Sequence, residues 1–126
     1  MLTQKIQTNT VNISNIQKDT NLSNIITWTK ITLSNYYLHK NGNEVIISFN
    51  GTLKETIIGT AEVKVAENLP IPSTGSVIAI GACTNEDKNQ PVRFRVKNDG
   101  TLNIYWAHID LLSGYEISAH LSYFTN

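Results

Sequence analysis

The sequence predicts an all-β protein of about eight antiparallel strands, arranged as a sandwich, a jelly roll or a small barrel. The helix formers Ala, Glu and Leu are sparse, whereas Asn, Thr and Ile are abundant. The second half of the chain is a series of short β-branched or aromatic runs separated by Gly, Pro and Asn, which is typical of strands joined by turns. The expected strands are Ile25–Leu33, Tyr36–Lys40, Glu44–Leu53, Ala61–Val65, Ser76–Ala82, Val92–Lys97, Thr101–Ala107 and Tyr115–Phe124.

Length and charge restrict the possible partners. The 126 residues suffice for one domain with a substantial core. The 10 basic and 10 acidic residues balance to a net charge of zero. Because phosphate binding needs an excess of Lys and Arg on one face, we expect no nucleic-acid partner. No apolar stretch is long enough to span a bilayer and the polar N-terminus lacks the apolar region of a signal peptide, so we expect no membrane insertion.

Residues 1–24 are polar, free of glycine and weakly patterned. We therefore assign residues 1–24 to a linker or neck segment and residues 25–126 to the β domain. A heptad spacing favours a coiled-coil neck, whereas the Thr and Val residues inside it are poor helix formers and favour an extended linker or a first strand. The heptad positions are Leu2, Ile6, Asn9, Ile13 and Ile16.

Metal, redox and catalytic signatures are missing from the sequence. The single cysteine, Cys83, lies in the apolar run "SVIAIGAC" and is expected to be a small buried hydrophobe. The three histidines are dispersed, and no Cys or His pair has the spacing of metal ligands. His108, Asp110 and Ser113 are not accompanied by a nucleophile elbow, which a hydrolase of this kind would need. We expect no metal, no cofactor and no enzymatic activity.

The stretch "VRFRVKNDGTLNIYW" predicts a hairpin whose three-residue turn, Asn98-Asp99-Gly100, places Gly100 at positive φ. This turn sets Lys97 opposite Thr101 and, further along, Val92 opposite Trp106. Apolar and polar residues then separate onto two faces, which supports the register. The expected core face holds Val92, Phe94, Val96, Leu102, Ile104 and Trp106. The expected outward face holds Arg93, Arg95, Lys97, Thr101, Asn103 and Tyr105, with Arg93 able to lie over the Tyr105 ring.

A second hairpin is predicted in "YYLHKNGNEVIISFNGTLK", with its turn at Asn41-Gly42 or at the wider Asn41-Gly42-Asn43. His39, beside the turn, is expected to be a solvated edge residue. Trp28 is expected in the core because it alternates with Ile26, two residues earlier in the same strand. The core-facing residues of the second strand are expected to be Val45, Ile47 and Phe49.

These elements, in this order, resemble the C-terminal head domains of phage tail fibre and baseplate receptor-binding proteins from phages of Gram-positive bacteria. The matching parts within residues 25–126 are "ITWTKITL", "YYLHKNGNEVIISFNG", the Leu-Pro loop "NLPIPSTGSV", "VRFRVKNDGTLNI" and the last strand "ISAHLSYF". The resemblance implies a non-catalytic homotrimer at the tip of the phage tail, in the virion, in contact with other tail or baseplate proteins. It also implies binding to cell-wall or surface saccharides of the host.

The resemblance also suggests a binding site near "WAHIDLLSGYE", where Trp106, His108 and Asp110 alternate. Planar rings and carboxylate, imidazole or guanidinium groups suit saccharides, and heads of the lactococcal branch use Trp, His, Asp and Arg. The candidate ligand-binding residues are therefore His108, Asp110, Arg93, Arg95, Tyr105 and Trp106. Alternatively, Trp106 packs in the core, His108 and Asp110 are loop residues, and the outward arginines form a solvated face or a subunit contact.

Two other function classes fit the same sequence. One is a structural tail or baseplate module whose trimerisation is its whole role. The other is a free-standing carbohydrate-binding module. Glycan binding separates the first from a receptor-binding head, and the oligomeric state separates the second, because most free-standing binding modules are monomeric.

Overall fold

The computed structural model describes residues 18–86 and 88–126, which form an all-β domain without helices, as the sequence predicts. No helix able to cross a bilayer is therefore found in this part of the chain. The heptad positions of the expected neck lie outside the described residues. The strands are β1 (Asp19–Asn21), β2 (Thr27–Trp28), β3 (Ile31–Asn41), β4 (Glu44–Leu53), β5 (Val63–Glu67), β6 (Val77–Asn85), β7 (Lys88–Val96), β8 (Leu102–Ala107) and β9 (Glu116–Phe124).

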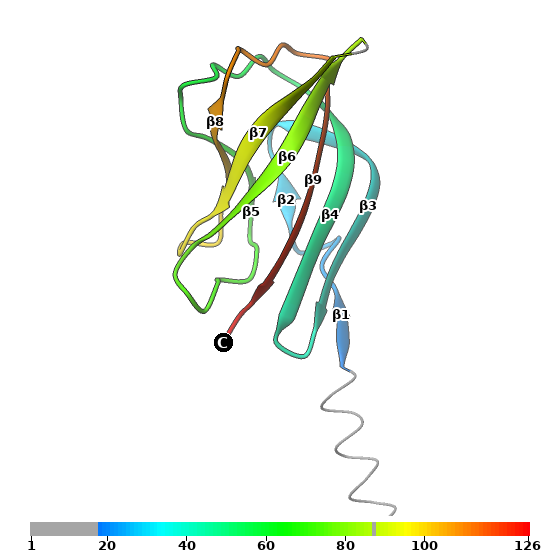
Figure 1. The fold of residues 1–126 in the computed structure, drawn as a ribbon. Helices are drawn as coiled ribbons and strands as arrows, with labels where there is room; N and C mark the ends of the chain where they lie inside the picture. The colour runs from blue at the N-terminus through cyan, green and yellow to red at the C-terminus, as the bar shows by residue number, and fades with distance from the viewer. Residues whose placement is uncertain (1–17, 87) are drawn as a thin grey trace, which may run out of the picture.

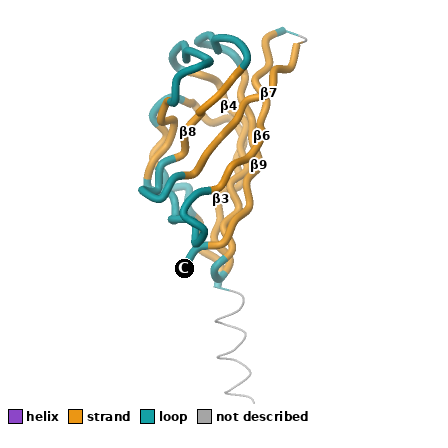
Figure 2. Tube along the Cα trace, turned by 60° about the vertical axis from the view of Figure 1, so that its left-hand side comes forward, coloured by secondary structure: helices purple, strands orange, loops and turns teal. Residues whose placement is uncertain are grey.

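All these strands belong to one sheet in the order β1-β3-β4-β9-β6-β7-β8-β5-β2, and neighbouring strands are antiparallel. β2 and β3 are near opposite ends of this order, yet only Thr29 and Lys30 separate them along the chain. The sheet therefore has to curl until its two ends approach, which gives the half-barrel visible in Figure 1 and Figure 2. Curling buries one face of the sheet and leaves the other exposed.

The buried face forms the hydrophobic core. The Phe49 ring of β4 lies 4.8 Å from the Trp28 ring of β2 and 5.8 Å from the Phe94 ring of β7, centroid to centroid. Because these strands are not neighbours in the sheet, the two contacts hold the curl together. The expected core face of β4 is confirmed, whereas Trp28 is only partly buried against the core. Fully buried residues include Val45, Ile47, Leu102, Ile104, Ile117 and Leu121.

β3 differs most from the strands expected. The sequence predicts separate strands at Ile25–Leu33 and Tyr36–Lys40, whereas the chain forms the two-residue β2 and then one long β3. A β-bulge at Ser34 interrupts the pairing of β3 with β4. The Ser34 hydroxyl donates a hydrogen bond of 3.1 Å to the Asn50 carbonyl oxygen, so a side chain compensates for the interruption.

The sheet begins upstream of residue 25. β1 pairs with the end of β3, where Asp19 is opposite Asn41, and Leu22 is buried in the core. Nδ1 of His39 lies 2.9 Å from a carboxylate oxygen of Asp19. β1 therefore covers this end of β3, and the expectation that His39 is a solvated edge residue is wrong.

The β3–β4 turn is one residue further along the chain than the Asn41-Gly42 pair expected. Asn41 pairs with Glu44, so the turn consists of Gly42 and Asn43. Gly42 has a φ of +57°, which glycine adopts readily.

The β7–β8 hairpin follows the expected register near its turn. Gly100 has a φ of +78°, and the Lys97 N–H donates to the Thr101 carbonyl oxygen at 2.9 Å. The Asp99 carboxylate accepts hydrogen bonds from the hydroxyl and the backbone N–H of Thr101, and these bonds lower the pKa of Asp99. The expected pairing continues as far as Phe94 opposite Ile104.

A β-bulge at Tyr105 then shifts the register by one residue. Arg93 pairs with Trp106, and Val92 pairs with Ala107. Because a shift of one residue reverses the face, Trp106 lies on the exposed side and Ala107 takes the buried position. The predictions that Trp106 packs in the core and pairs with Val92 are therefore wrong.

Cys83 is buried in β6, as expected for a small apolar residue. Burial raises the pKa of its thiol to about 11. The thiolate, which is the reactive form, is therefore scarce at neutral pH.

Replacing Gly100 with valine tests the hairpin turn. The residue has positive φ, and an added Cβ would lie 2.8 Å from the Leu69 carbonyl oxygen. We expect Gly100→Val to lower the free energy of unfolding by about 1–3 kcal/mol, measured by equilibrium denaturation in guanidinium. Gly75→Val is the matched control, because Gly75 has a φ of +90° but open space around its Cβ. An equal loss in both variants would show that the Leu69 contact is unimportant, and no loss at Gly100 would contradict the turn.

Candidate functional site

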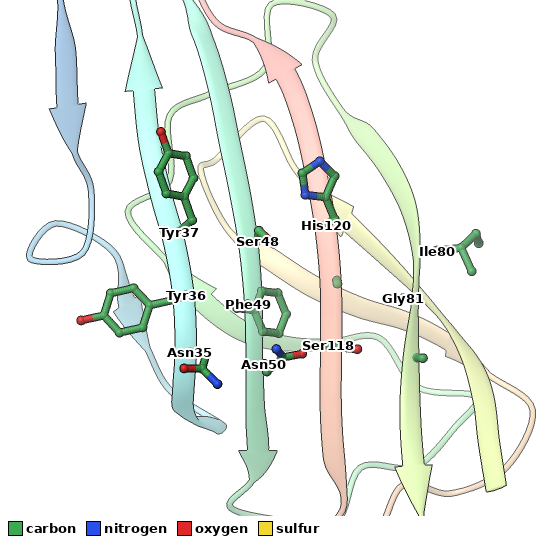
Figure 3. A pocket seen from close by; sticks show the side chains of 12 residues that line it. Asn35, Tyr36, Tyr37, Ser48, Phe49, Asn50, Ile80, Gly81, Ser118 and His120 are labelled. Atoms are coloured by element: carbon green, nitrogen blue, oxygen red, sulfur yellow. The ribbon is translucent and has the colours of Figure 1, made fainter.

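The exposed face of the curled sheet brings most candidate residues together. We name it the outer face and define it by the side chains that alternate with the core on β3, β4, β9, β6, β7 and β8. An arginine–aromatic cluster occupies β7 and β8, and a groove lies over β3, β4, β9 and β6 (Figure 3). The cluster consists of Arg93, Arg95, Tyr105 and Trp106. The side chains of the groove used below are Asn35, Tyr37, Ser48, Asn50, Ile80, Ser118 and His120.

Each arginine of the cluster lies over an aromatic ring. Cζ of Arg93 is 5.1 Å from the centroid of the Trp106 ring, and Cζ of Arg95 is 4.6 Å from that of Tyr105. The sequence predicted Arg93 over Tyr105, and the bulge in β8 changes that pairing. Cation–π contacts of this kind fix the orientation of both partners.

The two arginines have different surroundings. Arg95 is partly buried, and its Nη2 forms an ion pair with Glu62 at 3.2 Å. Its Nε is buried without a hydrogen-bond partner. Arg93 is exposed and forms no ion pair with any residue that the structure describes. Arg93 is therefore the arginine whose donors are available to a ligand.

His108 joins the cluster, whereas Asp110 takes part in a loop contact. The His108 ring is exposed, and its centroid is 6.2 Å from that of Trp106. β8 ends at Ala107, so the alternation that grouped the two residues in the sequence does not continue. Oδ1 of Asp110 accepts a hydrogen bond of 3.0 Å from the Gly59 N–H and thereby ties two loops together.

The groove is an open depression of about 640 Å³ beside the cluster. In one cross-strand row, Tyr37 is opposite Ser48 and Ser48 is opposite His120. Ile80 borders the groove on the far side and pairs with Arg93, which connects the groove to the cluster. The second row consists of Asn35, Asn50, Ser118 and Ala82, and its first three members carry a short amide or hydroxyl group. The walls therefore offer many neutral donors and acceptors.

The groove is present because β6 and β9 separate. They pair only through Ala82–Thr84, although β6 spans nine residues. Gly81 lies where the separation begins, and a Cβ there would collide with the Ser118 carbonyl oxygen and the Phe94 ring. Glycine at this position therefore lets the two strands stay close at the floor of the groove.

Tyr37 is held in place by a stacked neighbour. Its ring lies 4.2 Å from the His39 ring with an interplanar angle of 19°, and His39 is bound to Asp19. Tyr36 borders the groove, but its ring points away from it (Figure 3). The exposed fractions of Tyr36 and Tyr37 are similar, at 55% and 46%. The two tyrosines thus form a matched pair of which only one ring faces the groove.

Burial raises the pKa of Cys83 and of Tyr123, and both residues lie in the core. The Tyr123 hydroxyl donates a hydrogen bond of 2.8 Å to the Pro70 carbonyl oxygen, which is a structural contact. Among residues 18–86 and 88–126, no group of three or more His, Cys, Asp or Glu side chains is placed to hold a metal ion.

Comparison of the chain with models of known protein families finds no match, and comparison with curated protein sequences finds none either.

Sequence reasoning missed the groove. The alternation in "IISFN" and "ISAHLS" places Ser48 and His120 between buried residues, and in "SNYYLH" Tyr37 directly precedes the buried Leu38. What local patterns do not contain is the strand order β3-β4-β9-β6, which places residues distant in the chain side by side.

Trp106→Ala tests whether the bulge places the indole outside the core. Trp106 is 36% exposed, so we expect a loss of about 1 kcal/mol in the free energy of unfolding, mainly from the cation–π contact. Phe94 is fully buried, and Phe94→Ala should cost about 3–5 kcal/mol. Urea denaturation of both variants measures the difference. Equal losses in the free energy of unfolding would show that Trp106 packs in the core.

Proposed function

We propose that this chain is a non-catalytic head domain that attaches a phage tail, as a homotrimer, to saccharides of the host cell surface. The arginine–aromatic cluster beside a polar groove supports saccharide binding. The ordered set of elements in residues 25–126 supports the assignment to a phage tail or baseplate, and the all-β fold is compatible with it.

The chemistry of the cluster suits a sugar ring. The exposed part of the Trp106 indole packs against the apolar C–H face of a pyranose. Arg93 and His108, both near the indole, donate hydrogen bonds to hydroxyls. Each such contact contributes only about 0.5–1.5 kcal/mol, or up to about 3 kcal/mol with a charged donor. Three sites on one trimer, and many trimers on one tail, raise the avidity by roughly 10²–10⁴.

A structural module is the second candidate, because the same face carries exposed apolar side chains. Ile78, Ile80 and Phe124 are 56%, 61% and 63% exposed. Apolar side chains gathered on one face are typical of contacts with other proteins. A trimer that binds no glycan would favour this second function.

Glycan arrays that include Gram-positive cell-wall polysaccharides test the first function. We expect the parent protein to bind, and Arg93→Ala and Trp106→Ala each to weaken binding about tenfold or more, because each removes a direct contact. Lys88→Ala is the matched control, since Lys88 is an exposed cation at the other end of the same strand. Undiminished binding by both variants would place the site elsewhere, and no binding by the parent protein would favour the structural module.

The homotrimer is tested separately by light scattering at micromolar concentration. We expect the mass of three chains, because apolar side chains remain exposed on the isolated subunit. A monomer would contradict the tail assignment and favour a free-standing carbohydrate-binding module.

A further inference from the structure

We infer that the outer face binds a linear oligosaccharide of several units, which lies across the strands from Trp106 to Tyr37, rather than one sugar at the cluster. This inference rests on the proposed saccharide binding and adds the length and direction of the ligand.

A row of side chains crosses six strands of the outer face. Its first half contains Tyr37, Ser48 and His120 on β3, β4 and β9, and its second half contains Ile80, Arg93 and Trp106 on β6, β7 and β8. Ile80 and His120 lie two residues beyond the last pair of β6 and β9, Ala82 and Ser118, where these strands have separated. Both residues line the groove, and the gap between β9 and β6 lies between them (Figure 3). The row thus runs from the groove to the cluster and crosses this gap.

The two rings at the ends of this row are too far apart for a small ligand. Five steps separate β3 from β8, four of them paired spacings of about 4.8 Å and one the wider gap between β9 and β6, so Tyr37 and Trp106 are at least roughly 24 Å apart along the sheet. A monosaccharide or disaccharide therefore reaches only one of the two rings, which is Trp106 for a sugar bound at the cluster. Only a chain of several units reaches both.

Both end rings are already oriented for stacking. Arg93 lies over Trp106, and His39 stacks on Tyr37 with an interplanar angle of 19°. Rings fixed before binding lose less conformational entropy when a ligand packs on them. Between them, the Ser48 hydroxyl and the His120 imidazole supply polar contacts for the hydroxyls of the middle units.

Titration calorimetry with size-graded fragments tests this inference. The probes are the disaccharide, tetrasaccharide, hexasaccharide and octasaccharide obtained by partial hydrolysis of purified Gram-positive cell-wall polysaccharide. We expect the affinity of the parent protein to rise with length. Tyr37→Ala should weaken the binding of the longer fragments about 3- to 10-fold, which is the effect of losing one aromatic contact. The affinity for the disaccharide should stay unchanged. Trp106→Ala should weaken the binding of fragments of every length.

Two variants control for indirect effects. Tyr36→Ala removes an equally exposed ring that points away from the groove, so it should bind every fragment like the parent. Tyr37→Phe keeps the ring and should retain the length dependence.

Three results would overturn the inference. If affinity does not depend on length, or if Tyr37→Ala equals Tyr36→Ala, while Trp106→Ala still weakens binding, the ligand is confined to the cluster and the proposed function stands. If no fragment binds the parent protein, the inference and the proposed function both fail. If Tyr37→Ala dissociates the oligomer in light scattering, the groove is a subunit contact.

Discussion

The packing of Phe49 against both Trp28 and Phe94 is the contact on which the rest of the molecule depends. A single sheet has no partner layer, so it can bury its apolar side chains only by curling onto itself. Phe49 joins β4 to β2 and to β7, strands that the hydrogen-bond ladder does not bring together. Once one face is buried in this way, the side chains of the opposite face are not needed to form the core. Polar, aromatic and charged side chains can then gather on it without loss of stability.

How much of this fold the sequence predicts depends on the range of the interactions. The turn at Gly100, the pairing of Phe94 with Ile104 and the buried face of β4 all follow from local patterns, and all are confirmed. The strand order is not local, because the pairing of β4 with β9 and of β6 with β9 joins distant segments. Local sequence patterns also do not predict the bulge at Tyr105. A regular hairpin sorts the residues just as cleanly, and the extra residue is evident only in the structure, where Arg93 pairs with Trp106 and Ala107 is buried.

The two parts of the candidate site both arise where the regular sheet is interrupted. The bulge turns the Trp106 indole to the exposed side, beside Arg93, and so creates the cluster. The separation of β6 from β9 creates the groove. Alternation along β7 correctly predicted that Arg93 and Arg95 alternate with buried residues, but the alternation linking His108 to Asp110 failed because β8 ends at Ala107. Regular alternation thus explains the core, while interruptions of it position the side chains available to a ligand.

The bulge at Ser34 has a further consequence for the sheet's open edge. β1 pairs with only the last three residues of β3, so among the described residues the stretch from Thr32 to Tyr37 has no strand beside it on that edge. A straight, unpaired edge is a template onto which another chain can add a strand, and this addition begins aggregation. The bulge breaks the regular spacing of backbone donors and acceptors along this stretch, and exposed polar side chains flank it. The bulge therefore protects this edge against strand addition at high protein concentration, where two exposed edges meet most often.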